Sequence, residues 1–281
     1  MITTGSINTV RRLVGRAKKG SKIVGFVPTM GALHQGHISL IRRCRRECDF
    51  VLASIFVNPI QFGPKEDYSN YPRRLSRDKM LLKREEVDVL FLPSVGSFYA
   101  GDFSTFVFEE RLSKILCGKS RPGHFKGVLT VVAKLFNVVL PDKAYFGQKD
   151  YQQSILIRKM ANELNIPVKI EICPIVREKD GLAISSRNEY LNPKERLDAL
   201  CLFEATRLFK KLVKEGRRSS REIIKMLKGL ILSRESAKIG YVSIIDASNL
   251  KEIKTIKGRV ALVLAVKIGK TRLIDNCIIT A

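Results

Sequence analysis

Two of the three histidines in the chain lie close together in the segment Pro28-Thr29-Met30-Gly31-Ala32-Leu33-His34-Gln35-Gly36-His37. This segment follows an apolar, β-rich stretch and opens a stretch with helical spacing. On the first turn of a helix, His34 and His37 would lie on one face. Two imidazoles placed in this way could bind the same phosphate chain and offset the charge that develops at an attacked phosphorus.

The position of this segment also favours an anion. Where a strand of a parallel sheet ends and a helix begins, unpaired backbone N–H groups and the helix dipole attract phosphate. Gly31 and Gly36 allow tight turns and a close approach of the backbone to a ligand. The spacing differs from the dinucleotide fingerprint G-x-G-x-x-G, and no glutamate stands between the histidines as in the zinc motif H-E-x-x-H. The alternative is a histidine pair that bonds only to the local backbone.

A second polar group is expected where the next strand ends, in residues 54–62. Asn58 and Gln61 offer neutral donors and acceptors, which suit a hydroxy acid. The alternative is turn chemistry around Asn58-Pro59, with Gln61 exposed to solvent.

A third group lies in residues 145–153, again between a strand and a helix. Lys149 can neutralise phosphate oxygens as a point charge. Asp150 can cap the helix, hold Mg²⁺ or bind a ribose hydroxyl. Gln153 lies one helical turn further on. The alternative is a charged, well-capped surface helix.

The last group is Ser185, Ser186 and Arg187, two hydroxyls and a guanidinium that could clamp an oxyanion. It lies near the expected joint between two domains, where ligand clefts are common. A solvated Ser/Arg loop is the alternative. The third histidine, His124, opens another expected helix in Arg121-Pro122-Gly123-His124-Phe125.

The elements that must position these residues alternate between strands and helices in the first part of the chain. Apolar, β-rich runs predict strands, and apolar residues three and four apart predict helices. The alternation predicts an α/β fold, a Rossmann-like parallel sheet with helices on both faces. Strands are predicted at 22–27, 50–57, 87–92, 143–146 and 168–176. Helices are predicted at 38–47, at 76–86 with Ser76 as the cap, at 125–140 and at 151–164.

The later part of the chain predicts a smaller α+β domain. A long amphipathic helix over 194–215 and a second helix ending near 233, capped by Ser219 or Ser220, precede three strands. These strands are predicted at 241–246, 259–267 and 271–279, with a hairpin turn at Gly269-Lys270. We therefore expect two domains, 1–176 and 177–281.

The chain of 281 residues is strongly basic, with 51 Lys and Arg against 27 Asp and Glu. The excess is spread along the chain, with 23 basic and 12 acidic residues from Arg177 onward and 28 and 15 before it. A solvated basic surface or the attraction of anionic substrates such as ATP explains this pattern. A nucleic-acid-binding protein is the alternative from a different class, although we find no recognition motif of the known kinds.

Six cysteines form no C-x-x-C pair, which favours reduced thiols. The sequence has no apolar run of the roughly 18 residues that a membrane span needs. Residues 1–8 lack the features of a secretory signal. We therefore expect a cytoplasmic protein with no membrane partner.

Five motifs together resemble the pantothenate synthetase family, the pantoate–β-alanine ligases of the H-x-G-H nucleotidylyltransferase superfamily. They occur in the order of the family and span nearly the whole chain. The first motif alone would fit any member of the superfamily, whereas the segments with Asn58, Gln61 and Gln153 narrow the match to this family. The five motifs are P-T-M-G-A-L-H-x-G-H, S-I-F-V-N-P-x-Q-F, R-P-G-H-F, Y-F-G-x-K-D-Y-Q-Q and D-G-L-A-x-S-S-R-N.

The resemblance implies an ATP-dependent condensation of (R)-pantoate with β-alanine, through a pantoyl adenylate, that yields pantothenate, AMP and diphosphate. It also implies Mg²⁺, a homodimer, an N-terminal Rossmann-like domain for ATP and pantoate, and a C-terminal lid domain. The closest alternative is another adenylyltransferase of the same fold, which transfers a nucleotide to a phosphorylated acceptor.

The resemblance also implies residue roles. His37 would be the proton donor, with His34 and Lys149 beside it in catalysis, while Gln61 would contact both pantoate and β-alanine and Gln153 pantoate. Asp78 matches an acidic position suggested for Mg²⁺, and some relatives carry another acid where this chain has Arg77. The implied ATP-binding residues are Met30, Gly31, Ala32, Leu33, His34, Gln35, Gly36, His37, Gly147, Gln148, Lys149, Asp150, Val176, Ile184, Ser185, Ser186 and Arg187.

Overall fold

The structure is a computed structural model of the chain, and it describes residues 1–64 and 66–281. It divides into two compact units. The first unit comprises residues 1–147 and 153–174, and the second comprises residues 148–152 and 175–281. The short segment 148–152 therefore belongs to the second unit, although it is flanked in sequence by the first.

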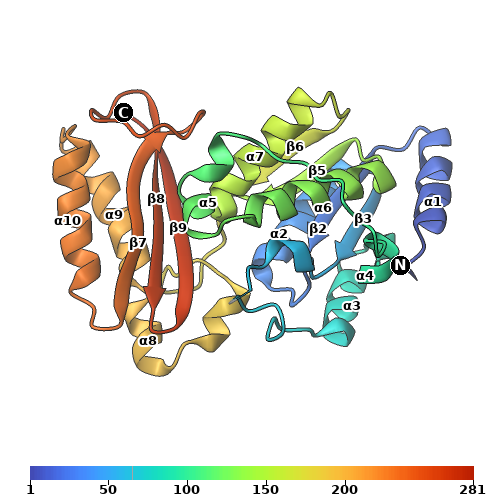
Figure 1. Ribbon diagram of the computed structural model, residues 1–281, viewed down its shortest axis with the longest axis horizontal. Coiled ribbons are helices and arrows are strands. Elements are labelled where there is room, and N and C mark those ends of the chain that lie inside the picture. Colours follow the sequence, from blue (N-terminus) through green and yellow to red (C-terminus); the bar gives the residue numbers. More distant parts are fainter. Residues whose placement is uncertain (65) are drawn as a thin grey trace. The chain divides into compact units, whose positions relative to one another are not determined.

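A six-stranded parallel sheet forms the centre of the first unit, with the strand order β1-β4-β3-β2-β5-β6 (Figure 1). Its inner strands are short apolar runs, and Val51, Leu52 and Ala53 are fully buried, as expected when helices cover both faces of a sheet. This architecture confirms the predicted α/β fold class. The strands are β1 Ile2–Thr4, β2 Val24–Thr29, β3 Phe50–Ile55, β4 Val89–Phe91, β5 Lys143–Gly147 and β6 Lys169–Cys173.

Helices pack on this sheet from both sides. Helix α2 contacts β2, β3 and β5, whereas α1 and α6 contact each other and β2. The helices of this part of the chain are α1 Ile7–Lys19, α2 Gln35–Glu47, α3 Leu75–Arg84, α4 Val95–Phe98, α5 Cys117–Ser120, α6 His124–Val139 and α7 Tyr151–Glu163. Short 3₁₀ turns are η1 Pro59–Gln61, η2 Leu112–Lys114 and η3 Gln148–Asp150.

Strand β2 lies between β3 and β5 and pairs in parallel with both. The chain leaves β2 towards β3 and returns later to β5 on the other side, so the strand order reverses at β2. In open parallel sheets, ligands bind at the carboxyl ends of the strands beside such a reversal. The segments that follow β2, β3 and β5 are the three in which the sequence predicts binding residues.

The second unit contains a three-stranded antiparallel sheet in the order β7-β8-β9 and three helices (Figure 1). Helix α10 packs on β7, and α9 packs on β8, β9 and α10 around a core that includes Phe209, Leu227 and Leu262. Residues Ile268 and Thr271 pair across the predicted turn at Gly269-Lys270, which confirms that hairpin. The elements are α8 Pro193–Asp198, α9 Cys201–Lys214, α10 Ser220–Leu232, β7 Ala237–Asp246, β8 Arg259–Ile268 and β9 Thr271–Thr280, together with the 3₁₀ turn η4 Ser186–Tyr190.

Two details of the helix prediction are wrong. The single helix over 194–215 is two helices, because the Leu200 and Leu202 N–H groups bond three residues back, to Leu197 and Ala199, and so tighten the chain into a turn. Ser76 is not the cap of α3, because the Asp78 N–H already bonds to the Arg74 carbonyl and Arg74 is the N-cap of a helix that begins at Leu75. Ser219 does cap α10, by accepting the Glu222 N–H.

The first strand and helix, β1 and α1, were not predicted. Strand β1 has three residues and lies at the sheet edge, so its sequence carries almost no periodic signal. Helix α1 buries Val10, Val14 and Ala17 among several arginines and lysines. Its apolar face is narrow, and the resulting spacing is easily overlooked.

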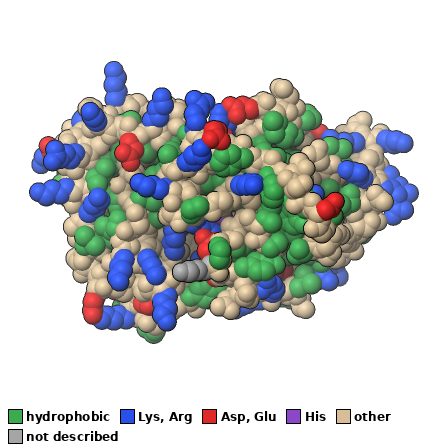
Figure 2. Space-filling view, viewed as in Figure 1, with side chains coloured by type: hydrophobic (Ala, Val, Ile, Leu, Met, Phe, Trp, Pro, Cys, Tyr) green, Lys and Arg blue, Asp and Glu red, His purple; other side chains and the backbone are tan. Residues whose placement is uncertain are grey.

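Lys and Arg side chains are spread over the face shown in Figure 2 and are interspersed with apolar and acidic ones. The six cysteines are all buried, and none of them forms a disulfide. In the two stretches of chain that the structure describes, no helix has both the length and the apolar character that crossing a bilayer demands.

Candidate active site

The histidine pair lies where β2 is followed by α2. His34 is the N-cap of α2, and its Nδ1 accepts the Gly36 N–H at 3.2 Å. The His37 Nδ1 accepts the His34 N–H at 3.3 Å, and the two ring centroids are 4.1 Å apart. A Cβ at position 36 would lie 2.9 Å from the His34 ring, so glycine at this position is what allows the imidazole to cap the helix.

These two hydrogen bonds fix the proton positions on the rings. A ring nitrogen that accepts an N–H carries no proton, so each neutral imidazole carries its proton on Nε2. Each Nδ1 thus accepts a backbone N–H, and the proton of each neutral ring lies on Nε2.

The predicted cradle of unpaired backbone N–H groups is wrong for most of this segment. The Gly31 N–H donates to Thr29 Oγ1 at 3.2 Å, and the N–H groups of Ala32 and Leu33 donate to the two carboxylate oxygens of Asp78 at 2.9 and 2.8 Å. The N–H groups of the two residues that bond to the imidazoles are also engaged. An anion at this position would therefore be held mainly by side-chain donors and by the dipole of α2.

The residues that follow β3 meet the histidine segment through Gln61. The Gln61 Nε2 lies 3.1 Å from the Met30 Sδ. Asn58, which is 1% exposed, donates from Nδ2 to the Gln61 Oε1 at 3.0 Å and to the Gly127 carbonyl at 3.1 Å. Its Oδ1 accepts from the Tyr99 hydroxyl at 2.8 Å. Asn58 therefore orients Gln61, and both hydrogens of its amide nitrogen are already used in these bonds.

His124 holds the main chain of Gln61. Its Nδ1 lies 2.8 Å from the Gln61 carbonyl oxygen, and its Nε2 lies 2.9 Å from an Arg121 nitrogen. Arg121 also forms a two-pronged ion pair with Glu66, with Nε to Oε1 at 2.6 Å. Burial works to raise the pKa of Glu66, but the Arg121 guanidinium outweighs it and holds the pKa below its usual value. Sequence reasoning assigned no role to His124, Glu66 or Arg121, although Arg121 and His124 lie in the motif R-P-G-H-F.

Helix α6 comes unusually close to the Gln61 turn. A Cβ at Gly127 would lie 2.3 Å from the Ile60 carbonyl oxygen and 2.6 Å from the Gln61 backbone. Glycine is therefore required for this approach. The close packing of α6 explains how a turn of three residues can hold a polar side chain in a defined place.

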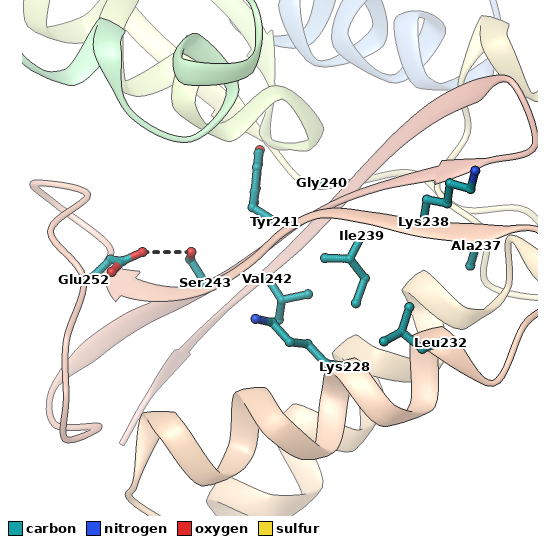
Figure 3. Close-up of a pocket in the computed structure, with 10 residues that line it drawn as sticks. All are labelled: Lys228, Leu232, Ala237, Lys238, Ile239, Gly240, Tyr241, Val242, Ser243 and Glu252. Atoms are coloured by element: carbon teal, nitrogen blue, oxygen red, sulfur yellow. Dashed lines mark hydrogen bonds between the residues drawn. The ribbon is translucent and has the colours of Figure 1, made fainter.

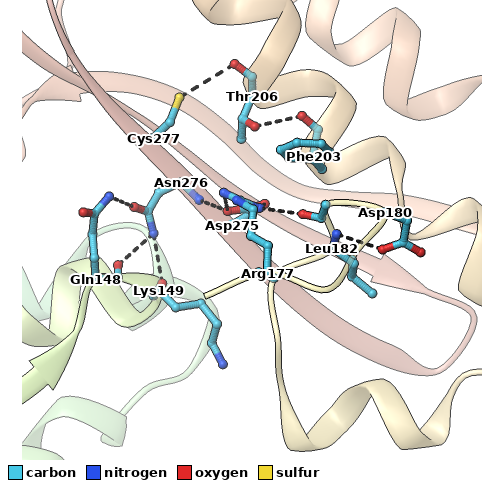
Figure 4. Close-up of polar contacts among 12 residues, drawn as sticks. Gln148, Lys149, Arg177, Asp180, Leu182, Phe203, Thr206, Asp275, Asn276 and Cys277 are labelled. Atoms are coloured by element: carbon cyan, nitrogen blue, oxygen red, sulfur yellow. Dashed lines mark hydrogen bonds and ion pairs between the residues drawn. The ribbon is translucent and has the colours of Figure 1, made fainter. Parts of the chain in front are cut away.

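In the second unit, the residues of η3 are tied to β9 (Figure 4). The Asn276 Nδ2 donates to the carbonyl oxygens of Gln148 and Lys149 at 2.9 and 3.0 Å, and the Gln148 Nε2 donates back to the Asn276 Oδ1 at 3.1 Å. The Lys149 Nζ lies 3.9 Å from the Asp150 Oδ2. The Lys149 backbone is thus fixed by hydrogen bonds that do not use its ammonium group.

Two other predicted ATP-binding segments meet within the second unit. The Ile184 N–H donates to the Val176 carbonyl at 3.0 Å, so the start and end of this loop pair with each other. Arg177 forms a bidentate ion pair with the buried Asp275, at 2.6 and 2.9 Å (Figure 4). Ser185 Oγ accepts the Arg187 N–H at 3.3 Å and caps η4.

Two further predicted residues lie near the ends of β5 and α7. Gly147 ends β5, and Gln153 is half-buried in the first turn of α7.

A cavity of about 690 Å³ in the second unit lies beside β7 and α10, and none of the predicted site residues lines it (Figure 3). Among the residues that the structure describes, no group of three or more His, Cys, Asp and Glu side chains could hold a metal ion.

A parallel sheet with a reversal of strand order at β2, followed by a histidine-capped helix, is typical of doubly wound α/β proteins that bind a ligand at this edge. Comparison with known proteins gives the family. The family profile described as Pantoate-beta-alanine ligase matches residues 2–278. The pantothenate synthetase of Caldicellulosiruptor saccharolyticus is 50% identical over 279 residues, 99% of each chain.

Solved structures agree with this match. The crystal structure of pantothenate synthetase from Thermus thermophilus superposes with a TM-score of 0.94 at 42% identity and covers 99% of both chains. The pantoate-beta-alanine ligase from Francisella tularensis, complexed with beta-gamma ATP and beta-alanine, has a TM-score of 0.81 at 38% identity and covers 99% of this chain and 97% of that one. The chain belongs to the pantoate–β-alanine ligase family, which confirms the resemblance, and it is therefore an enzyme of the ligase class.

Proposed function

We propose that this chain condenses (R)-pantoate with β-alanine at the expense of ATP and forms pantothenate, AMP and diphosphate. The observation that carries the proposal is the contact between the two loops of the first unit. The Gln61 amide contacts Met30, and Met30 belongs to the same segment as His34 and His37, which supports a shared site. The two histidines can bind phosphate oxygens and the Gln61 amide a hydroxy acid.

The reaction proceeds in two steps. A carboxylate is a poor acylating agent, so a pantoate carboxylate oxygen first attacks the α-phosphorus of ATP, and the bond from that phosphorus to the bridging oxygen of diphosphate breaks. The neutral amine of β-alanine then attacks the carbonyl carbon of pantoyl adenylate, AMP leaves with the C–O electron pair, and the nitrogen loses a proton. The chain needs to supply no covalent nucleophile.

The residues of the first unit screen and position the reactants. His34 and His37 donate from Nε2 to phosphate oxygens and so offset the charge that develops when one anion attacks another. Gln61 contacts pantoate and β-alanine, Gln153 contacts pantoate, and Asn58 holds Gln61 in place. Residues Met30 to His37 form the adjoining wall of the ATP site.

The residues of the second unit form the other part of the proposal. Lys149 neutralises phosphate charge, and ATP is also contacted by Gln148 and Asp150 and by the segment with Val176 and Ile184 to Arg187. Gly147, which ends β5 in the first unit, is a further proposed ATP contact. Because an acyl adenylate hydrolyses readily in water, we assign this C-terminal part of the chain, predicted as 177–281, to a lid that excludes water.

We propose that Mg²⁺ binds together with ATP, because this ion usually binds phosphates and one or two carboxylates and keeps several waters. The bound ion would neutralise phosphate charge. Asp150, with a side chain that is 47% exposed, fits such a site. Chelation with EDTA should stop AMP formation, and added Mg²⁺ should restore it.

We also propose that the protein is a homodimer and is located in the cytoplasm. Sedimentation would test the oligomeric state, and cell fractionation would test the location.

The direct test is AMP formation with ATP, Mg²⁺ and pantoate, with and without β-alanine. We expect continuous AMP release only when β-alanine is present, and one adenylate per site without it. Another adenylyltransferase of this fold would not respond to β-alanine.

Two substitutions test the assigned donors. His37→Ala and Lys149→Ala should each slow adenylate formation at least about 100-fold, the scale of losing one transition-state donor. His37→Gln keeps a neutral N–H and should be less impaired than the alanine variant, while Lys267→Ala on the exposed face of β8 is a matched control for charge. Near-normal rates in His37→Ala or Lys149→Ala would remove that residue from its role.

A further inference from the structure

Asp78 is a buried carboxylate whose partners are backbone groups. It lies in the first turn of α3 and is 1% exposed. Its Oδ2 accepts the Ala32 N–H at 2.9 Å and its Oδ1 accepts the Leu33 N–H at 2.8 Å. In the described part of the chain, no lysine or arginine pairs with it. A buried charge is costly unless it is hydrogen-bonded, so these two bonds account for its burial.

The loop that Asp78 contacts has a strained backbone. Gly31 and Ala32 both have positive φ, at 81° and 49°. For alanine this left-handed conformation costs roughly 1–2 kcal/mol. Successive backbone N–H groups in a turn can form a concave anion-binding nest. In other proteins a nest often holds phosphate, whereas here the carboxylate of Asp78 fills it.

The geometry does not suit Asp78 as a magnesium ligand. Mg²⁺ requires a nearly octahedral set of oxygen ligands and keeps several waters. Each carboxylate oxygen of Asp78 already accepts an N–H, and the side chain is almost inaccessible to solvent. A Cβ at Gly31 would lie 3.1 Å from the Asp78 Oδ2, so the loop also closes over the carboxylate.

We infer that Asp78 is a positioning residue for the histidine pair and does not bind the metal. It fixes Ala32 and Leu33, and the next residue is His34, which caps α2 and donates its N–H to His37. The carboxylate therefore sets the place of both imidazoles relative to the sheet. This inference rests on the proposed function only for the effect on catalysis, because the anchoring of the loop can be measured separately.

The first test replaces Asp78 by Asn, which keeps one acceptor and places an amide N–H against the second loop N–H. We expect kcat for pantoate-dependent diphosphate release to fall ~10- to 100-fold, as expected for a displaced catalytic group, with the KM for ATP changed much less. The Mg²⁺ concentration for half-maximal activity should not change. A shift of that concentration by about tenfold or more would identify Asp78 as a metal ligand and overturn the inference.

Asp88→Asn is the matched control. The Asp88 carboxylate also accepts a backbone N–H, that of Val51 at 2.7 Å, but it pairs with Arg45 and does not contact the loop. It should lose stability and keep its kcat. An equal loss of kcat in both variants would mean that Asp78 has a merely structural role.

A second test uses the wild-type protein and therefore applies even if the Asp78→Asn variant does not fold. Hydrogen exchange at the Ala32 and Leu33 amides should be slow and should stay slow when Mg²⁺ and ATP are added. Faster exchange of these two amides on addition of Mg²⁺ would show that the ion displaces them from the carboxylate. This readout needs no turnover, so it distinguishes failure of the inference from failure of the proposed ligase activity.

Discussion

At the scale of single residues, the proton on His124 is placed by its partners. An arginine guanidinium can only donate hydrogen bonds, so the His124 Nε2 beside Arg121 must accept. The proton therefore lies on Nδ1, which donates to the Gln61 carbonyl oxygen. Glu66 thus holds Arg121, Arg121 holds the His124 ring, and the ring holds the backbone of Gln61 in place.

This assignment predicts opposite results for two amide substitutions. His124→Asn places an amide nitrogen near the Nδ1 position and keeps the bond to Gln61, whereas His124→Gln places it near Nε2 and loses that bond. The KM for pantoate should stay within about 3-fold of wild type in the first variant and rise about 10-fold in the second, the scale of one buried hydrogen bond. Steady-state kinetics with pantoate varied would measure this, and equal effects would contradict the tautomer.

At the scale of elements, Glu47 fastens α2 to the sheet. It accepts hydrogen bonds from Arg43 at 2.8 Å, from the Tyr145 hydroxyl at 3.0 Å and from Lys143 at 3.4 Å. Arg43 also forms an ion pair with Glu171 on β6, with its Nη2 2.7 Å from the Glu171 Oε2. The hydrogen bond from Arg43, with smaller help from Tyr145, lowers the pKa of Glu47 from 4.5 to about 2 against the opposing effect of burial.

The lowered pKa predicts how stability depends on pH. The ionised carboxylate stabilises the fold above its unfolded pKa, and this contribution disappears as the pH falls towards the folded pKa of about 2. Because the side chain is 30% exposed, solvent screening limits the effect. Glu47→Gln should cost about 1 kcal/mol of unfolding free energy at about pH 7 and almost nothing at about pH 2.

Urea unfolding of wild type and Glu47→Gln across this pH range would measure the difference. Glu163→Gln removes an exposed partner of Lys159 on α7 and serves as the control, with almost no change at any pH. A cost for Glu47→Gln that does not vary with pH would show that packing, and not charge, is what the substitution removes.

The sequence predicted the strand–loop–helix pattern well because apolar runs and turn residues are local signals. It predicted the wrong use of the loop N–H groups, because their acceptor is Asp78, distant in sequence, and no local rule links the two. Asn58 was predicted as a substrate-binding residue, and its contacts with Gln61, Tyr99 and Gly127 could not be read from the sequence. Contacts of this kind arise only when the sheet brings several segments to one edge.

At the scale of the whole molecule, the excess of basic residues could allow the protein to bind nucleic acid. The densest cluster of arginines, on α2, is largely neutralised by internal ion pairs. These are Arg42–Glu85, Arg43–Glu47 and Arg45–Asp88. Filter binding at about 150 mM salt should therefore show weak retention of DNA or RNA that falls steeply with added salt. Tight, sequence-selective retention would favour a nucleic-acid-binding protein.

The central claim is that pantoate attacks ATP to form an adenylate before any amine takes part. The most direct measurement is the exchange of labelled diphosphate into ATP with Mg²⁺ and pantoate present and β-alanine absent. Exchange that requires pantoate and is lost in His37→Ala is the predicted result. Exchange that appears only when β-alanine is added, or that proceeds without pantoate, would contradict the account.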